Sequence, residues 1–195
     1  PGQYFNTVTY TGDGSSSNAI TGVGFQSNLI WIKNRDTAED HALFDSVRGQ
    51  SGGVYYKIRS NATNAQDADS QGLSTIGSDG FTVKDNDQVN KNSDKLVAWC
   101  WKEDTTAGFD IITYSGSSSS QDISHGLGVK PDWILNKIIS TTGEWNVYHD
   151  SFAQGERIKL NSTGAKNTNN SIYDALPDSS VIHIGTSGDI NTDGA

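Results

Sequence analysis

Residues that could act as acids, bases or nucleophiles are few in this sequence. Glutamate occurs only at positions 39, 103, 144 and 156, and none of these belongs to the close alternation of acidic residues by which sandwich glucanases build the carboxylate pair of a glycosidase. The run His149-Asp150-Ser151 has the residue types of a hydrolytic triad. Neighbouring residues in a strand point to opposite faces, so we expect these side chains not to converge. The sequence predicts no catalytic residues and no enzyme activity.

Metal and cofactor sites are equally poorly indicated. Asp85, Asp87 and Asn90 resemble the oxygen-rich spacing that Ca²⁺ prefers, but the glycine and terminal glutamate of an EF-hand are absent. We therefore favour a solvated turn there. The glycine pairs at 22–24 and 126–128 precede no expected helix, so they predict turns rather than a phosphate-binding loop. No cofactor is expected.

Aromatic side chains offer the remaining binding chemistry. Tyr55, Tyr56, Trp133 and Trp145 are candidate platforms for stacking on a sugar ring, with Asn and Asp side chains to hydrogen-bond its hydroxyls. Adjacent strand residues alternate between faces, so one of each pair of neighbours is expected in the core. A lectin-like site is the interpretation these residues permit.

The elements that must position these side chains read as strands throughout. Short runs of β-branched and aromatic residues alternate with Gly, Ser, Asn and Asp clusters, and no segment above ten residues has a convincing helical period. Asn61 and Thr63 are N-cap residue types that allow one turn of helix around residues 62–68. The expected strands are 7–11, 29–33, 42–45, 53–58, 81–84 and 95–101, then 111–115, 133–137, 146–149, 157–160 and 181–184.

The two halves of the chain repeat each other. Phe5–Gly12 matches Phe109–Gly116, and Leu29–Lys33 matches Trp133–Lys137, each 104 positions later; residues 58–65 match 158–165 at an offset of 100. We predict an all-β protein of two tandem β-sandwich or jelly-roll repeats, residues 1–108 and 109–195. The second repeat lacks a counterpart of strand 95–101, so we expect it to be incomplete. A single larger sandwich built from both halves is the alternative.

The amino-acid composition excludes several classes of binding partner. The net charge of −9 argues against a nucleic-acid groove, and no apolar run approaches the ~20 residues of a membrane span. The single cysteine excludes an internal disulfide. A start at Pro1 and the absence of methionine suggest a segment of a longer polypeptide.

The ordered motifs resemble a known domain type. They are YTGDG at 10–14, LIWIK at 29–33, LFDSVRG at 43–49 and VAWCW at 97–101, with HGLG at 125–128, PDWI at 131–134 and WNVYH at 145–149 in the second half. Together they resemble the tandem β domain of large virion proteins of tailed, especially marine, bacteriophages. The resemblance covers nearly the whole chain and implies a concanavalin-like sandwich without catalytic residues.

We therefore expect a non-enzymatic structural or adhesion module of a tail fibre or capsid-attached fibre. Its expected partners are other virion subunits, a homo-oligomer (most plausibly a trimer) and a host-surface glycan, with no nucleic acid and no membrane span. The expected location is the surface of the phage particle, and the extracellular space after release. A secreted carbohydrate-binding module and a capsid decoration protein are the alternatives.

Overall fold

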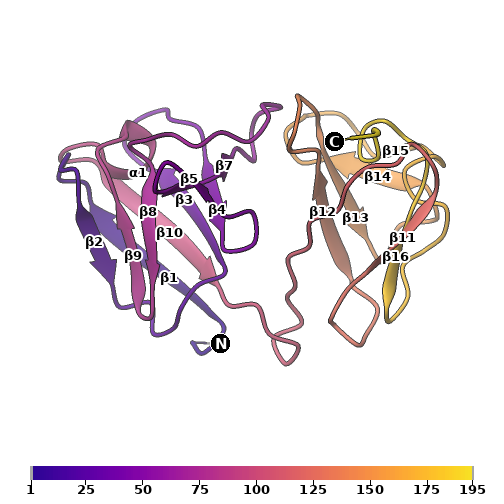
Figure 1. Cartoon of the computed structure of the whole chain (residues 1–195), viewed down its shortest axis with the longest axis horizontal. Helices are drawn as coiled ribbons and strands as arrows, with labels where there is room; N and C mark the ends of the chain where they lie inside the picture. Colours follow the sequence, from indigo (N-terminus) through magenta and orange to yellow (C-terminus); the bar gives the residue numbers. More distant parts are fainter. Residues whose placement is uncertain (1, 195) are drawn as a thin grey trace. The chain divides into compact units, whose positions relative to one another are not determined.

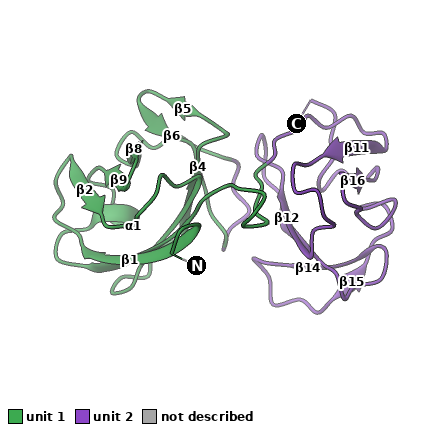
Figure 2. Ribbon diagram, turned by 90° about the horizontal axis from the view of Figure 1, so that it is seen from below, with its two compact units in different colours: residues 1–60, 66–111 green, residues 61–65, 112–195 purple. Residues whose placement is uncertain are grey.

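The computed structural model describes residues 2–194 and shows an all-β chain whose strands pair in antiparallel sheets (Figure 1). It divides into two compact units (Figure 2). The first contains residues 1–60 and 66–111, and the second contains residues 61–65 and 112–195. Within residues 2–194, no helix is long and apolar enough to cross a membrane.

The main sheet of the first unit has the strand order β1-β10-β3-β4-β7. Its strands are β1 (Phe5–Thr11), β10 (Lys95–Trp101), β3 (Leu29–Asn34), β4 (Ala42–Asp45) and β7 (Lys57–Ile58). A second sheet contains β2 (Asn18–Thr21), β9 (Gly80–Val83) and β8 (Leu73–Gly77), and β5 (Gln50–Ser51) pairs with β6 (Val54–Tyr55). The helix α1 (Asp87–Asn90) is one turn long.

Strand β10 is the centre of this unit. It pairs with β1 along all seven residues and with β3 on its other side. Leu96, Ala98 and Cys100 are fully buried and share one core with residues of the second sheet, including Phe81 and Val83. The two sheets therefore pack on a common core, as in a β-sandwich.

The outer face of β10 carries the alternate side chains. Trp99 and Trp101 are half-buried there and contact Trp31 of β3, with ring centroids 6.1 and 6.4 Å apart. The prediction that strand 95–101 is central and apolar on both faces is confirmed.

The second unit has a four-stranded sheet in the order β12-β13-β14-β15 and a separate pair, β11 with β16. These are β12 (Trp133–Lys137), β13 (Trp145–His149), β14 (Glu156–Lys159), β15 (Asn167–Thr168), β11 (Gln121–Ser124) and β16 (Val181–Ile184). Five buried side chains form the hydrophobic core cluster of this unit: Tyr148, Ile172, Tyr173, Ile184 and Ile190.

Three expectations about the elements are corrected. Residues 111–115 form no strand, although their counterparts in β1 do. Residues 53–58 divide into β6 and β7, with Tyr56 between them. The helical turn lies at 87–90 rather than 62–68, because the Asn86 side chain accepts a hydrogen bond from Gln88 N and so caps it.

Equivalent contacts recur in both units. Tyr10 Oη donates to Val89 O at 2.7 Å, and Tyr114 Oη donates to Ile190 O at 2.6 Å. Ser46 N donates to Asn28 O as Asp150 N donates to Asp132 O. Each pair of partners matches the sequence offset of about one hundred residues.

A buried asparagine near the end of each unit shows the same correspondence. Asn90 Oδ1 accepts from Asp13 N at 3.0 Å, and Asn191 Oδ1 accepts from Ser117 N at 2.8 Å. Both asparagines are fully buried. They close the serine-rich loop that follows residue 12 or residue 116.

Candidate functional site

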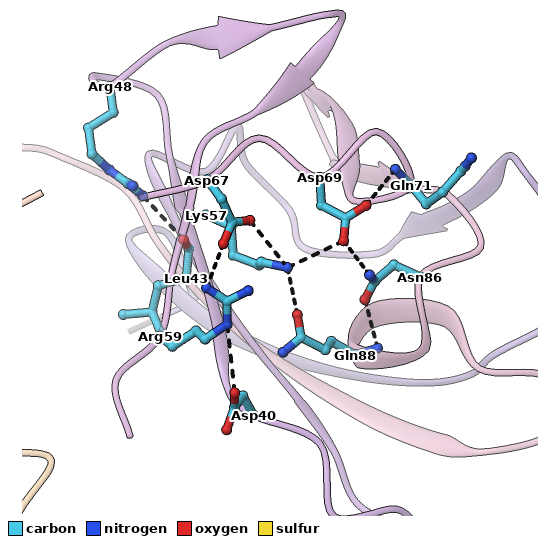
Figure 3. Close-up of polar contacts among 10 residues, drawn as sticks. All are labelled: Asp40, Leu43, Arg48, Lys57, Arg59, Asp67, Asp69, Gln71, Asn86 and Gln88. Carbon is cyan, nitrogen blue, oxygen red and sulfur yellow. Dashed lines mark hydrogen bonds and ion pairs between the residues drawn. The ribbon is translucent and has the colours of Figure 1, made fainter. Parts of the chain in front are cut away.

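Lys57 on β7 is a deeply buried cation whose side chain is 2 % exposed (Figure 3). Its Nζ donates to Gln88 Oε1 at 2.7 Å and lies 3.5 Å from Asp67 Oδ1 and 3.6 Å from Asp69 Oδ2. The backbones of Lys57 and Asp67 also exchange two hydrogen bonds. One hydrogen-bond acceptor and two ion-paired carboxylates therefore surround one buried ammonium.

The two carboxylates extend this cluster toward the surface. Asp67 Oδ2 also accepts from Arg59 Nη1 at 2.5 Å, and Asp40 lies 3.7 Å from Arg59 Nε. Asp69 Oδ2 accepts from Asn86 Nδ2 at 2.6 Å, and its other oxygen accepts from Gln71 N. Figure 3 shows the cations and acids alternating along the cluster.

The second unit has a buried cation at the matching position. Arg157 on β14 is 7 % exposed; its Nη1 donates to Asp189 Oδ2 at 2.8 Å and to Asn146 Oδ1, and its Nε donates to Asn167 Oδ1 at 3.3 Å. Arg157 follows Lys57 by 100 positions and Asp189 follows Gln88 by 101. The same interior position thus holds a cation in both units.

These cations tie strands to the turn that carries residue 88 or 189. An ammonium has no lone pair with which to attack an electrophile, and breaking a buried ion pair by removing one partner is strongly destabilising. Arg48 and Asp45 form a further pair in the first unit, with both side chains about as buried. These clusters can therefore hold strands and turns together through ion pairs and hydrogen bonds, which is a structural role.

His41 and His149 lie apart from the other histidines, whereas His125 and His183 both lie next to Asp178, with His183 Nε2 3.7 Å from Asp178 Oδ2. His41 Nδ1 accepts a 2.7 Å hydrogen bond from Trp31 Nε1, and burial together with the nearby Lys33 lowers the pKa of His41. His183 Nδ1 lies 2.7 Å from Asp122 Oδ1, beside a shallow depression that also contains Asp174. His125 Nε2 contacts Asp178 O at 3.2 Å.

The run at 149–151 corrects the expectation that its side chains stay apart. Strand β13 ends at His149, and the turn after it brings Ser151 Oγ to 2.8 Å from His149 Nδ1. Asp150 instead pairs with Lys130, which lowers the pKa of that carboxyl. The same ring nitrogen accepts from Ser151 N at 3.1 Å, as Asp45 accepts from Val47 N in the first unit. His149 therefore caps a turn, and among residues 2–194 no carboxylate is hydrogen-bonded to its ring.

The Trp133 patch, defined as Trp133, His149 and Phe152, is an exposed aromatic surface on the second unit. Trp133 is 60 % exposed and meets the His149 ring edge-on with centroids 5.8 Å apart. The Phe152 ring lies 5.9 Å from His149, with Lys166 Nζ 5.4 Å from its centroid. An exposed indole flanked by polar groups can stack on the apolar face of a sugar ring.

The other aromatic candidates are placed differently. The Trp145 ring is only 4 % exposed, so the expectation that it forms a surface platform is corrected. It occupies the interior position of β13, where four successive residues are buried. Tyr55 and Tyr56 are half-buried in the first unit, and Tyr55 packs against the core. Trp133 is therefore the candidate with the greatest surface access.

The three residues of the candidate calcium site differ in burial, so their side chains do not face a common surface. Asp85 and Asp87 are exposed, whereas the Asn90 side chain is buried and bonds to Asp13, Ser15 and Asn18. Within residues 2–194, no three His, Cys, Asp or Glu side chains come together as a metal-binding group.

The buried cation clusters were missed by the sequence analysis. Lys57 and Arg157 occupy matching positions in the two halves, and a basic residue at a strand position in both copies was the signal that could have identified them.

A family profile described as a domain of unknown function (DUF7483) matches residues 1–195. Comparison with curated proteins and comparison with solved structures gave no match.

Proposed function

The chain belongs to the DUF7483 family along its whole length, and on that premise we propose that it is a non-enzymatic structural and adhesion module of two tandem jelly-roll repeats. The proposed setting is a bacteriophage virion, in a tail fibre or capsid-attached fibre that contacts the host surface. The resemblance of its ordered motifs supports that setting. The module would act as a homo-oligomer, with a trimer favoured.

The observation that carries the structural role is the duplicated interior network. Lys57 with Gln88 and Arg157 with Asp189 place a cation at matching positions. Tyr10 and Tyr114 close matching turns. Charged and polar side chains at equivalent places join strands to loops, which is what a rigid repeated module requires.

Two measurements test this role. Antibodies against residues 1–195 should label fibres on particles that carry the parent protein, and light scattering of the purified chain should give a trimer. A stable monomer that binds neither host cells nor envelope glycans would contradict the proposal. Turnover of a host polysaccharide by the purified chain would contradict its non-enzymatic part.

A second candidate function is carbohydrate binding, favoured by the exposed Trp133 patch. A glycan array probed with and without Ca²⁺ should give binding that Trp133→Ala abolishes. Val129→Ala is the matched control, because Val129 is also a 60 % exposed apolar residue of this unit but lies outside the patch. Equal binding by both variants, or by neither, would remove this candidate.

A further inference from the structure

We propose that the free edge of β12 in the second unit is a strand-acceptor site. Its ligand is an extended peptide that carries small or aliphatic residues on one face and aromatic residues on the other, as β10 does. This peptide would lie between β12 and residues 111–115. The inference goes beyond the proposed adhesion function and does not depend on it.

The first unit shows what occupies this position. There β10 fills the space between β1 and β3 and pairs with both. Ala98 lies opposite Val8 on one side and Ile32 on the other, and Trp99 lies opposite Thr7 and Trp31. The inward residues of β10 complete the core while its outward tryptophans cover β3.

In the second unit, the two segments that would flank this position are β12 and residues 111–115. Neither is paired with a strand on the side that faces it. Strand β12, the counterpart of β3, pairs with β13 and, among residues 2–194, with no strand on its other side. Residues 111–115, the counterpart of β1, form no strand. Tyr114 Oη accepts a 2.9 Å hydrogen bond from Asn136 Nδ2, so the two segments are linked by side chains rather than by a backbone ladder.

Side-chain exposure follows the same pattern. Ile134 is half-buried although its counterpart Ile30 is fully buried, and Leu135 is 42 % exposed although its counterpart Trp31 is half-buried. Trp133 is exposed beside them. An unpaired edge with exposed apolar residues favours the addition of a strand.

The backbone direction of β12 identifies which groups are free. Asp132 O accepts from Asp150 N, so Ile134 and Asn136, two and four positions on, direct their backbone groups toward β13. Residues 133, 135 and 137 therefore direct theirs to the open edge. In the first unit Lys95 O accepts from Arg35 N, which places the backbone groups of Val97 and Trp99 toward β3.

The test uses the full chain and a synthetic peptide with the sequence of residues 94–102, with alanine in place of Cys100. Hydrogen exchange measured by mass spectrometry should slow by about tenfold or more at residues 111–115 and 133–137 when the peptide is added. Exchange in the first unit should stay unchanged, since its own β10 is in place. No protection at any peptide concentration would overturn the proposal.

Two controls separate strand pairing from other binding. The same peptide N-methylated at the positions of Val97 and Trp99 should give no protection, and this control leaves the protein unaltered. Leu135→Pro removes a free edge N–H and should block binding, whereas Leu135→Thr keeps that N–H and should bind. Equal protection by the methylated peptide would overturn the proposal. So would protection of 133–137 that appears without peptide and disappears on dilution, because the occupant would then be a second copy of the chain.

Discussion

The phenol of Tyr10 donates a 2.7 Å hydrogen bond to the main-chain carbonyl of Val89, which lies 79 positions later in the chain. This bond joins the strand β1 to the helical turn α1. Burial strongly raises the pKa of Tyr10, so the hydroxyl stays protonated and remains a donor. Tyr114 and Ile190 repeat the relationship at 2.6 Å in the second unit.

Tyr10→Phe should destabilise the first unit by about 1–2 kcal/mol, because the buried Val89 carbonyl loses its donor. Tyr114→Phe should destabilise the second unit by a similar mechanism. Urea unfolding followed by hydrogen exchange of each unit measures both effects. A loss confined to the unit that carries the substitution is expected; an unchanged urea midpoint for Tyr10→Phe would show that the bond contributes nothing.

Gly12→Ala and Gly116→Ala should each destabilise their own unit by about 1–3 kcal/mol or more through overpacking. A Cβ at Gly12 would lie 2.1 Å from Lys91 O, and one at Gly116 would lie 2.0 Å from Thr192 O. Gly188→Ala is the control, because its nearest neighbour would be 3.4 Å away. Thermal unfolding of the three variants gives the comparison, and equal melting temperatures would refute the steric argument.

Gln88→Leu should destabilise the first unit by about 2–3 kcal/mol, because it removes the closest acceptor of a buried ammonium. The remaining carboxylates of Asp67 and Asp69 lie 3.5 and 3.6 Å away. Adding Lys57→Met should recover most of the loss, since the charge that lacked its partner is removed. A double-mutant cycle by urea unfolding measures this, and additive losses would contradict it.

The first unit should lose stability as the pH rises from 9 to 11. Burial raises the pKa of Cys100 to about 11 from 9.0, so between these values the native state binds more protons than the unfolded state. The stability contributed by the Cys100 thiol is therefore fully present below pH 9 and is lost as the pH rises above it. Urea midpoints from pH 8 to 11 should fall less steeply in Cys100→Ala. Tyr10 contributes a decline in the same direction above pH 10 in both proteins.

The second unit should instead become more stable as the pH rises from 8 to 9.5. Burial lowers the pKa of Lys137 to about 8 from 10.5, so above pH 8 the unfolded state binds more protons and stability rises with pH. The Lys137 contribution should be lost in Lys137→Met, whose urea midpoint should stay flat from pH 8 to 9.5. The same upward slope in that variant would show that another group is responsible.

Much of the strand pattern was predictable from local sequence. Strands 29–33, 42–45 and 95–101 combine β-branched and aromatic residues with a fixed alternation, and they form at those places. Short strands such as β2 and β11 were missed because their polar residues, including Asn18 and Gln121, leave little alternating signal. Pairing across the sheet, rather than propensity, determines them.

The wrong strand at 111–115 has a specific cause. Its residues have the same pattern as β1, yet β1 is a strand because β10 pairs with it along its length. Without such a partner the segment has no ladder to join. The partners of the buried cations were hidden for a similar reason, since only the fold brings Lys57 together with Gln88, 31 positions away.

The central position of β10 also determines when the first unit can form during synthesis. Strands β1 and β3 emerge from the ribosome early, but the strand between them ends at Trp101. Until that residue has left the ribosome, the edges of β1 and β3 that β10 will occupy are unpaired and can meet other nascent chains. A pause in translation before Lys95 would lengthen that exposure.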